Sequence, residues 1–357
     1  MSKLTFDDVL ITPQFSEINS RKAVDLYSRI GCIEAELPII SANMDTITNW
    51  KTSLAMHNNG ALACLHRFHN HDTNMTEYEN GAPQSIVSFG LGEQEKQRCK
   101  LLHAMGARSF CLDVAHGAQQ SVMLQTKWFK KQYPECTLIV GNFASVESVK
   151  EFMIRLGDYK LRPDAIKIGV GPGSACTTRL KTGCGYPQFS AIKEISQYCR
   201  KGHIKTIADG GMKTPGDIAK ALGAGASMVM LGGMLSGTDE TPGEIIYREH
   251  HIPGYVGGGT YIEPDILKIP IGKQYRGSAS KESYKDQGKE WSTAEGESFM
   301  VDCKGPIKNV LNEIKGGLQS AFSYVGAENL EQFHKKVSFV QISNSTVSEN
   351  GAHGKNN

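Results

Sequence analysis

The sequence predicts an α/β protein whose parallel strands close into a barrel. Eight short runs rich in β-branched and apolar residues recur at 38–45, 61–67, 85–91, 108–115, 137–142, 165–170, 204–209 and 227–232. Helix-compatible segments separate most of them, at 94–105, 119–133, 146–156, 189–200 and 214–222. Near-continuous apolar strands that alternate with helices indicate parallel pairing with both faces covered. Eight such units therefore favour a (β/α)8, or TIM, barrel.

The alternative is an open, doubly wound sheet. In that fold a glycine-rich dinucleotide fingerprint follows the first strand. Here the sequence Ser-Ala-Asn-Met-Asp stands at 41–45 instead. We therefore keep the open sheet as the second interpretation.

Length and composition are those of an ordinary soluble globular protein. The 357 residues include 39 Lys and Arg against 37 Asp and Glu, which leaves no charge excess to hold a nucleic acid. No apolar stretch approaches the roughly 20 residues of a membrane span, and the first residues lack the apolar core of a signal peptide. We expect a cytoplasmic protein with a single barrel domain over residues 1–340 and a disordered polar tail at 341–357.

The residues that follow the predicted strands are the candidate site, because barrel enzymes place their chemistry at the carboxyl ends of the strands. These residues are polar or small: Asn43, Asp45, His66, Arg67, Asp113, His116, Asn142, Gly171 to Cys176, Asp209 to Gly211, Gly232 and Gly233. Each of them could instead simply cap a turn. The paired glycines after the seventh and eighth strands suit a phosphate bound by backbone N–H groups. A nucleoside monophosphate fits that arrangement.

A cysteine in the loop after the sixth strand is the candidate nucleophile. The loop is rich in glycine, and Cys176 is flanked by Ser174, Thr177, Thr178 and Arg179. Hydroxyl donors and a nearby positive charge favour the thiolate form. The alternative is a glycine-rich surface turn with an incidental cysteine. The nine cysteines include no Cys-x-x-Cys pair, so they indicate neither a disulfide framework nor a zinc site.

The segment after the eighth strand, residues 236–303, has no clear apolar period. Its length and its many Gly, Ser and charged residues predict a mobile flap rather than part of the core. Helical spacing returns at 305–325.

The cysteine loop resembles that of the IMP dehydrogenase/GMP reductase family. The resemblance rests on Gly-Pro-Gly-Ser-Ala-Cys-Thr-Thr-Arg at 171–179 and on Thr-Gly-Cys-Gly-Tyr-Pro-Gln at 182–188, which is closer to the reductases, and it extends from Leu4 to Val340. It implies NADPH-dependent conversion of GMP to IMP and ammonia. Cys176 would add to C2 of the purine, Thr178 and Glu295 would relay a proton to the departing amine, and the resulting thioimidate would accept hydride.

The resemblance also implies roles for further residues. Those matched to GMP or IMP are Ser174, Asp209, Gly210, Gly211, Gly232, Gly233, Tyr275, Gly277, Ser278 and Gly296. Those matched to NADPH are Ser20, Arg21, Arg67, Asp113, Val114, Ala115, Gly316, Gln319 and Ser320. Those matched to a monovalent cation such as K⁺ are Gly171, Gly173, Cys176 and Arg179. The family pattern further implies a homotetramer.

Two other functions remain as alternatives. An IMP dehydrogenase, which oxidises IMP with NAD, normally carries an Arg-Tyr pair in its flap, but no such dipeptide occurs between 276 and 303. The chain also lacks the regulatory CBS insertion of most dehydrogenases. A non-catalytic purine-nucleotide binder on the same barrel is disfavoured because Cys176, Thr178 and Glu295 are all present.

Overall fold

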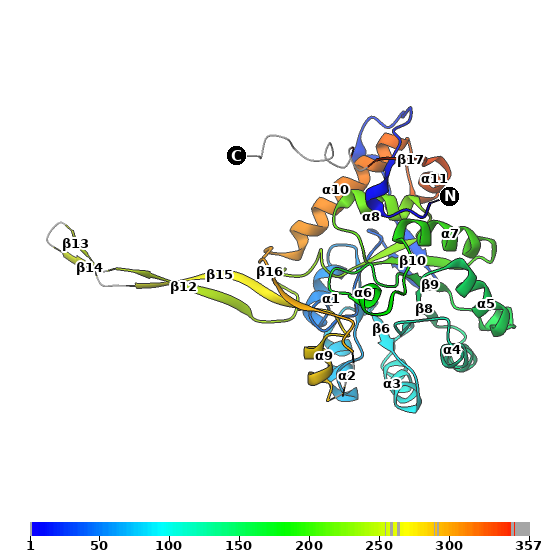
Figure 1. Cartoon of the computed structure of the whole chain (residues 1–357), viewed down its shortest axis with the longest axis horizontal. Coiled ribbons are helices and arrows are strands. Elements are labelled where there is room, and N and C mark those ends of the chain that lie inside the picture. Colours follow the sequence, from blue (N-terminus) through cyan, green and yellow to red (C-terminus); the bar gives the residue numbers. More distant parts are fainter. Residues whose placement is uncertain are drawn as a thin grey trace.

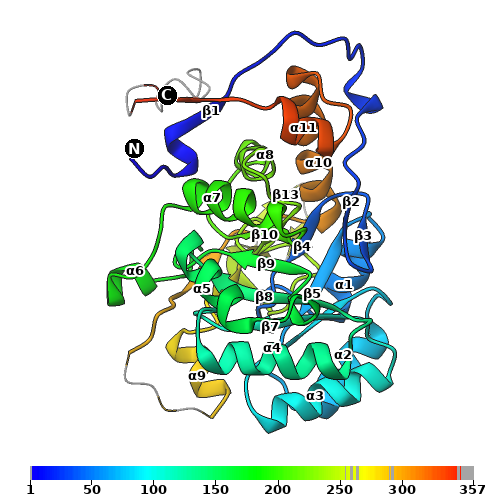
Figure 2. The same ribbon diagram turned by 90° about the vertical axis from the view of Figure 1, so that its right-hand side faces the viewer.

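The computed structural model confirms the closed barrel (Figures 1 and 2). It describes residues 2–343 and 346, except 254, 258, 259, 263, 264, 289, 291 and 292. The parallel strands are β4 (Ile39–Ser41), β5 (Leu62–Leu65), β6 (Ile86–Phe89), β7 (Ser109–Asp113), β8 (Thr137–Phe143), β9 (Ala165–Ile168), β10 (Lys205–Asp209) and β11 (Met228–Leu231). Each lies inside or nearly coincides with one of the predicted runs. Pairing of β11 with β4 closes the barrel, with Val229 opposite Ile39.

Helices surround the barrel. They are α1 (Trp50–His57), α2 (His71–Asn80), α3 (Glu93–Ala104), α4 (Gln120–Gln132), α5 (Val146–Leu156), α7 (Gln188–Lys201), α8 (Pro215–Gly223) and α10 (Ile307–Val325). The first two were not among the predicted helical segments, because α2 is mostly polar and neither helix has a strong apolar stripe. Asparagine caps mark where they begin: Asn49 accepts from Thr52 N–H, and Asn70 accepts from Thr73 N–H. None of the helices described is long and apolar enough to cross a bilayer.

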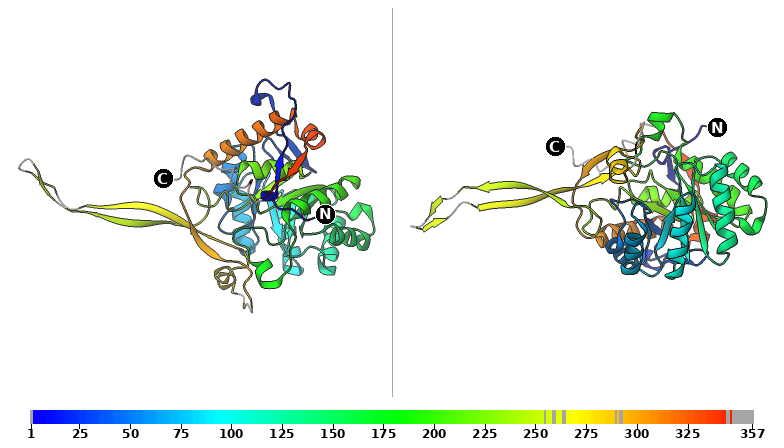
Figure 3. Two further views of the ribbon diagram at one scale, coloured as in Figure 1. Left: turned by 45° about the horizontal axis from the view of Figure 1, so that its top comes forward. Right: turned by 90° about the horizontal axis from the view of Figure 1, so that it is seen from below.

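The flap contains regular structure that the sequence did not reveal. Strands β12 (Ile245–Ile252) and β15 (Asp265–Arg276) form an antiparallel hairpin, extended by β13 (Tyr255–Gly257) and β14 (Thr260–Ile262). This arm, residues 245–276, projects away from the barrel (Figures 1 and 3). Much of β12 and β15 is exposed, so their sequences do not need to alternate apolar and polar residues. Without that alternation nothing in the sequence indicated these strands.

After the arm the chain returns to the barrel through residues 277–303, here called the return segment. It contains α9 (Lys281–Asp286) and β16 (Ser298–Val301), and β16 pairs with the base of β15. Lys273, at that base, is buried and donates from Nζ to the carbonyl oxygens of Thr238, Asp239 and Thr241. These contacts fix the arm to the loop that follows β11.

The two ends of the described chain meet on one side of the molecule. Strand β1 (Val9–Ile11), which follows the short helix η1 (Phe6–Asp8), pairs antiparallel with β17 (Phe339–Gln341), which follows α11 (Leu330–Lys336). The hairpin of β2 (Ser28–Ile30) and β3 (Ile33–Ala35) packs near the start of β8, where Cys32 N–H donates to Thr137. Of the predicted tail, residues 344, 345 and 347–357 lie outside the described residues.

Candidate active site

Two cavities adjoin at the carboxyl ends of the barrel strands. The first, of about 340 Å³, lies between the loops after β4, β7 and β9 and the return segment. The second, of about 520 Å³, lies beside the glycine pairs after β10 and β11. Both are lined by Ala42, Met44, Gly173, Asp209 and Tyr275, so they form one continuous site.

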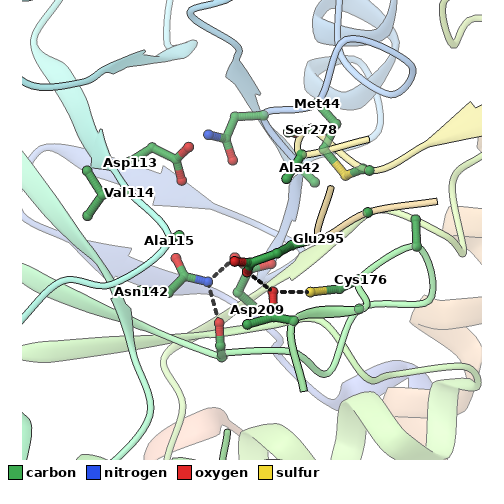
Figure 4. A pocket seen from close by; sticks show the side chains of 18 of the residues that line it. Ala42, Met44, Asp113, Val114, Ala115, Asn142, Cys176, Asp209, Ser278 and Glu295 are labelled. Carbon is green, nitrogen blue, oxygen red and sulfur yellow. Dashed lines mark hydrogen bonds between the residues drawn. The ribbon is translucent and has the colours of Figure 1, made fainter. Parts of the chain in front are cut away.

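Three reactive side chains form a hydrogen-bonded chain in the first cavity (Figure 4). The Cys176 thiol donates to the Thr178 hydroxyl, with Sγ and Oγ1 3.2 Å apart. Thr178 in turn donates to Glu295, with 2.8 Å between Oγ1 and Oε2. A thiol, a hydroxyl and a carboxylate in this order can move a proton between the sulfur and the carboxylate.

Backbone contacts bring these residues together from two distant segments. Thr177 N–H donates to Glu295 O over 2.8 Å, and Glu297 N–H donates to Ala175 O over 2.9 Å, so the return segment pairs with the cysteine loop like a short strand. A glycine is required at position 277, because a Cβ there would lie only 2.8 Å from Ala175 O. Glu295 therefore reaches the site only because the return segment packs against the cysteine loop.

Arg179, on the short helix α6 (Thr178–Thr182), organises the cysteine loop from inside. Its guanidinium donates to Val170 O over 3.2 Å and to Tyr186 O over 2.6 Å. Gly171 has a φ of +80°, and a Cβ there would lie 2.5 Å from Arg179 Cγ. Of the four residues predicted to hold a monovalent cation, Gly171, Gly173 and Cys176 lie in the loop and Arg179 lies on the helix that follows it. Gly173 O also accepts from Cys176 N–H over 3.0 Å.

A buried lysine joins two carboxylates at the floor of the first cavity. Lys167 Nζ lies 2.7 Å from Asp209 Oδ2 and 3.1 Å from Asp113 Oδ1, and Asn142 Nδ2 lies 2.9 Å from the same Asp209 oxygen. Burial alone would lower the pKa of Lys167, but the charges of Asp209 and Asp113 raise it well above its ordinary value. Burial alone would raise the pKa of Asp113, but Lys167 and Arg67 bring it below its ordinary value. Lys167 and Asp113 are therefore both charged.

Sequence reasoning missed Lys167. A lysine inside an otherwise apolar strand was not singled out as a site residue, although a charged residue in a strand buried on both faces has to find a partner. A charged residue in a buried apolar strand is therefore the signal that could have identified Lys167.

The second cavity gathers the residues predicted to contact a phosphate. Ser174, Gly210, Gly211, Gly232 and Gly233 line it. Two cations that were not predicted, Lys213 and Lys304, line it as well. Lys304 Nζ donates to Gly233 O over 2.9 Å and to Met234 O over 3.1 Å, so an ammonium group lies against the glycine turn.

The residues predicted to contact the cofactor fall into two groups. Arg67, Asp113, Val114 and Ala115 line the first cavity, together with Gly277, Ser278 and Gly296 from the return segment. Arg67 Nε is buried and has no hydrogen-bond partner among the described residues.

The second group lies elsewhere. Arg21 on η2 (Arg21–Ala23) donates to Ser320 Oγ on α10 over 3.1 Å, and Gln319 donates to Val24 O over 3.4 Å. Ser20, Arg21, Gly316, Gln319 and Ser320 line neither cavity. Their role as cofactor contacts stays a prediction.

Comparisons with known proteins agree on one family. A family model described as IMP dehydrogenase / GMP reductase domain matches residues 3–353. The chain is 35% identical to GMP reductase 1 of Mus musculus, over 95% of this chain and 95% of that protein. It is 35% identical to GMP reductase of Phytophthora infestans, over 96% of this chain and 91% of that protein. For GMP reductase of Klebsiella pneumoniae the identity is 31%, over 95% of each.

A solved structure supports the fold. It is that of a GMP reductase variant from Trypanosoma brucei in complex with guanosine 5'-monophosphate. The TM-score is 0.83 at 24% sequence identity, and the match covers 99% of this chain and 98% of that one.

Proposed function

The chain belongs to the IMP dehydrogenase/GMP reductase family, and we propose on that premise that it reductively deaminates GMP to IMP with NADPH. The observation that carries the proposal is the Cys176–Thr178–Glu295 hydrogen-bond chain in the first cavity. It supplies a nucleophile and a proton path at one place. Release of ammonia from C2 of guanine requires both.

The second cavity suits the nucleotide phosphate. Its glycine turns offer backbone N–H groups, Ser174 offers a hydroxyl, and Lys304 and Lys213 offset negative charge. Asp209, shared by both cavities, is the acceptor for the ribose hydroxyls. Lys167 and Asn142 hold its Oδ2 atom, which fixes the carboxylate for that contact. The purine would then extend toward Cys176.

The deamination step uses this chain's own residues. Cys176 loses its proton through Thr178 and adds to C2 of GMP, which makes that carbon tetrahedral. The amino group at C2 is a poor leaving group until it is protonated. Thr178, backed by Glu295, returns the proton to that nitrogen, the C2–N bond breaks, and ammonia departs. A thioimidate between Cys176 and C2 remains.

The residues of the first cavity fit a nicotinamide dinucleotide. The unpartnered Nε of Arg67 is a donor that an anionic or carbonyl group would satisfy, and it lies with Asp113, Val114 and Ala115 in the same wall. When bound, NADPH supplies the hydride that reduces C2 of the thioimidate. The C2–S bond then breaks, Cys176 leaves as the thiolate, and IMP is free.

A monovalent cation belongs to the proposal in a supporting role. The carbonyl oxygens of Gly171 and Gly173 are neutral, hard donors of the kind that suits K⁺. Arg179 already links the two sides of this loop, so K⁺ would add to a loop that is partly organised. The homotetramer implied by the family and the cytoplasmic location expected from the sequence remain predictions.

A steady-state assay tests the function. Purified protein is mixed with GMP and NADPH, and the loss of NADPH absorbance and the release of ammonia are measured together. We expect equal amounts of NADP⁺, ammonia and IMP, and no reaction with Cys176→Ala. NADH formation from IMP and NAD without GMP reduction would make the protein a dehydrogenase. Nucleotide binding with neither reaction would make it a binder.

A further inference from the structure

A second pair of cavities lies at the opposite end of the barrel. Two neighbouring cavities open where β9, β10 and β11 begin, one of about 190 Å³ and one of about 440 Å³. Both are lined by His203, Ile204 and Lys205. Barrel enzymes place catalysis at the carboxyl ends of the strands, so the proposed reaction does not account for these cavities.

The walls are rich in positive charge. Arg200 and Lys205 line the smaller cavity, and Lys160, Arg162 and Lys205 line the larger one. None of these four side chains forms an ion pair within the described part of the chain. Unneutralised cations around a concave surface raise the local concentration of anions.

Arg162 gives an independent indication of a ligand. Its Nε atom is buried and has no hydrogen-bond partner among the described residues, and Arg162 lines the larger cavity. A buried guanidinium donor without an acceptor costs free energy unless something outside the chain satisfies it. A planar guanidinium suits the oxygens of a phosphate group.

The acidic groups nearby do not cancel this charge. Asp164 lines the larger cavity, but its Oδ2 accepts from Lys130 Nζ over 3.0 Å and from Leu138 N–H over 2.8 Å. Lys205 lies within electrostatic range of Glu331, but the Glu331 carboxylate is paired with Lys335 over 2.5 Å. His334 lines the smaller cavity, and burial and the charge of Arg200 lower its pKa to about 4, so it is neutral at pH 7.

We propose that these two cavities form a binding site for a phosphate-bearing small molecule, whose phosphate groups lie among Arg162, Arg200 and Lys205. Tyr159, an exposed aromatic residue in the wall of the larger cavity, is positioned at the same site. Its ring offers a face on which a nucleobase can stack. The best-fitting ligand class is therefore a nucleotide with more than one phosphate, bound away from the site for GMP.

Calorimetric titration of the full chain tests the proposal. Saturating IMP first fills the nucleotide site, and ATP or inorganic tripolyphosphate is then titrated at low and at physiological ionic strength. We expect one additional site per chain, with affinity that falls as salt rises. The double variant Arg162→Gln/Arg200→Gln should weaken binding about tenfold or more, because two charge-assisted hydrogen bonds are lost.

Matched variants separate the contributions. Arg155→Gln, on the exposed face of α5, removes the same type of charge and should leave the affinity unchanged. Arg200→Lys keeps the charge but not the planar guanidinium. Its affinity for the ligand should lie between that of the double variant and that of Arg155→Gln. If Tyr159→Ala weakens ATP but not tripolyphosphate, stacking contributes; equal binding of both ligands means that phosphate alone is recognised.

Two outcomes would overturn the proposal: no additional binding to the unmodified protein, or equal affinity in the double variant. Because the readout is binding with IMP in place, the result does not depend on whether the protein reduces GMP.

Discussion

Thr178 and Glu295 are joined by a hydrogen bond of 2.8 Å although they belong to different structural segments, the start of α6 and the return segment. Thr178 also accepts from Cys176, so the proton path is complete only while the return segment lies against the cysteine loop. In the proposed mechanism, proton transfer is thereby coupled to the position of the return segment.

Glu295→Gln should separate deamination from hydride transfer. The amide keeps the shape of the carboxylate but cannot take up and return a proton. General acid–base assistance is typically worth about 10²- to 10⁴-fold, so we expect GMP reduction to slow within that range. Single-turnover formation of NADPH from IMP and NADP⁺ should be affected less, because no proton moves to a departing amine. Equal damage to both steps would make Glu295 a flap-closing residue instead.

Cys176→Ala should abolish turnover while GMP still binds, because phosphate and ribose contacts are retained. Equilibrium dialysis with GMP and the NADPH assay measure the two properties. Cys184→Ala is the matched control, since Cys184 is exposed in the same loop and outside the hydrogen-bond chain. Activity of Cys176→Ala close to that of the unmodified protein would rule out the covalent route.

Lys167→Met should lower the free energy of unfolding by about 3–5 kcal/mol, the usual cost of removing one partner of a buried ion pair. Two carboxylates, Asp113 and Asp209, would lose their common cation. Adding Asp113→Asn should recover part of the loss, because one negative charge is removed. Urea unfolding of the single and double variants measures this, and strictly additive losses would contradict the coupling.

Arg276→Lys should loosen the return segment. Arg276 bridges Asp45 after β4, over 2.6 Å, and Asp286 on α9, over 2.7 Å. An ammonium group cannot reproduce this two-sided contact. We expect the KM for GMP to rise about tenfold, as for the loss of one charge-assisted contact. Arg29→Lys, at an exposed ion pair on β2, is the control. An unchanged KM for Arg276→Lys would show that the bridge does not hold the site closed.

Stability should fall as pH falls from 7 to 5. His66 is buried, and burial, followed by the charges of His69, Arg98 and Arg276, lowers its pKa from 6.5 to about 3. Between these values the unfolded chain binds more protons than the folded chain, so acid favours unfolding. This histidine accounts for about 2 kcal/mol at pH 5. Between pH 7 and pH 5 the free energy of unfolding of His66→Asn should fall by about that much less than the free energy of unfolding of the unmodified protein. Urea unfolding at the two pH values measures this, and an equal fall in both proteins would contradict the assignment.

The sequence predicted most of the barrel because its strands are apolar on both faces and regularly spaced. It also indicated Cys176 as a candidate nucleophile from local chemistry, and the family resemblance favoured that role over an incidental cysteine. Glu295 came only from the family resemblance, since nothing local marks a glutamate that reaches the site through backbone pairing of two distant segments. Lys167 was missed because its partners, Asp113 and Asp209, stand on other strands. The arm was missed because its strands do not face a core.

The pairing of β1 with β17 places the first and last described strands side by side, with Val9 opposite Gln341. The chain could therefore start at a different point without any change in the order of the strands round the barrel. A circular permutant that joins β17 to β1 through a short linker and opens the chain at the exposed turn of Gly157 and Asp158 should keep every barrel strand and both segments of the proposed proton path. In such a permutant the loop that carries Cys176 would lie near the new amino terminus.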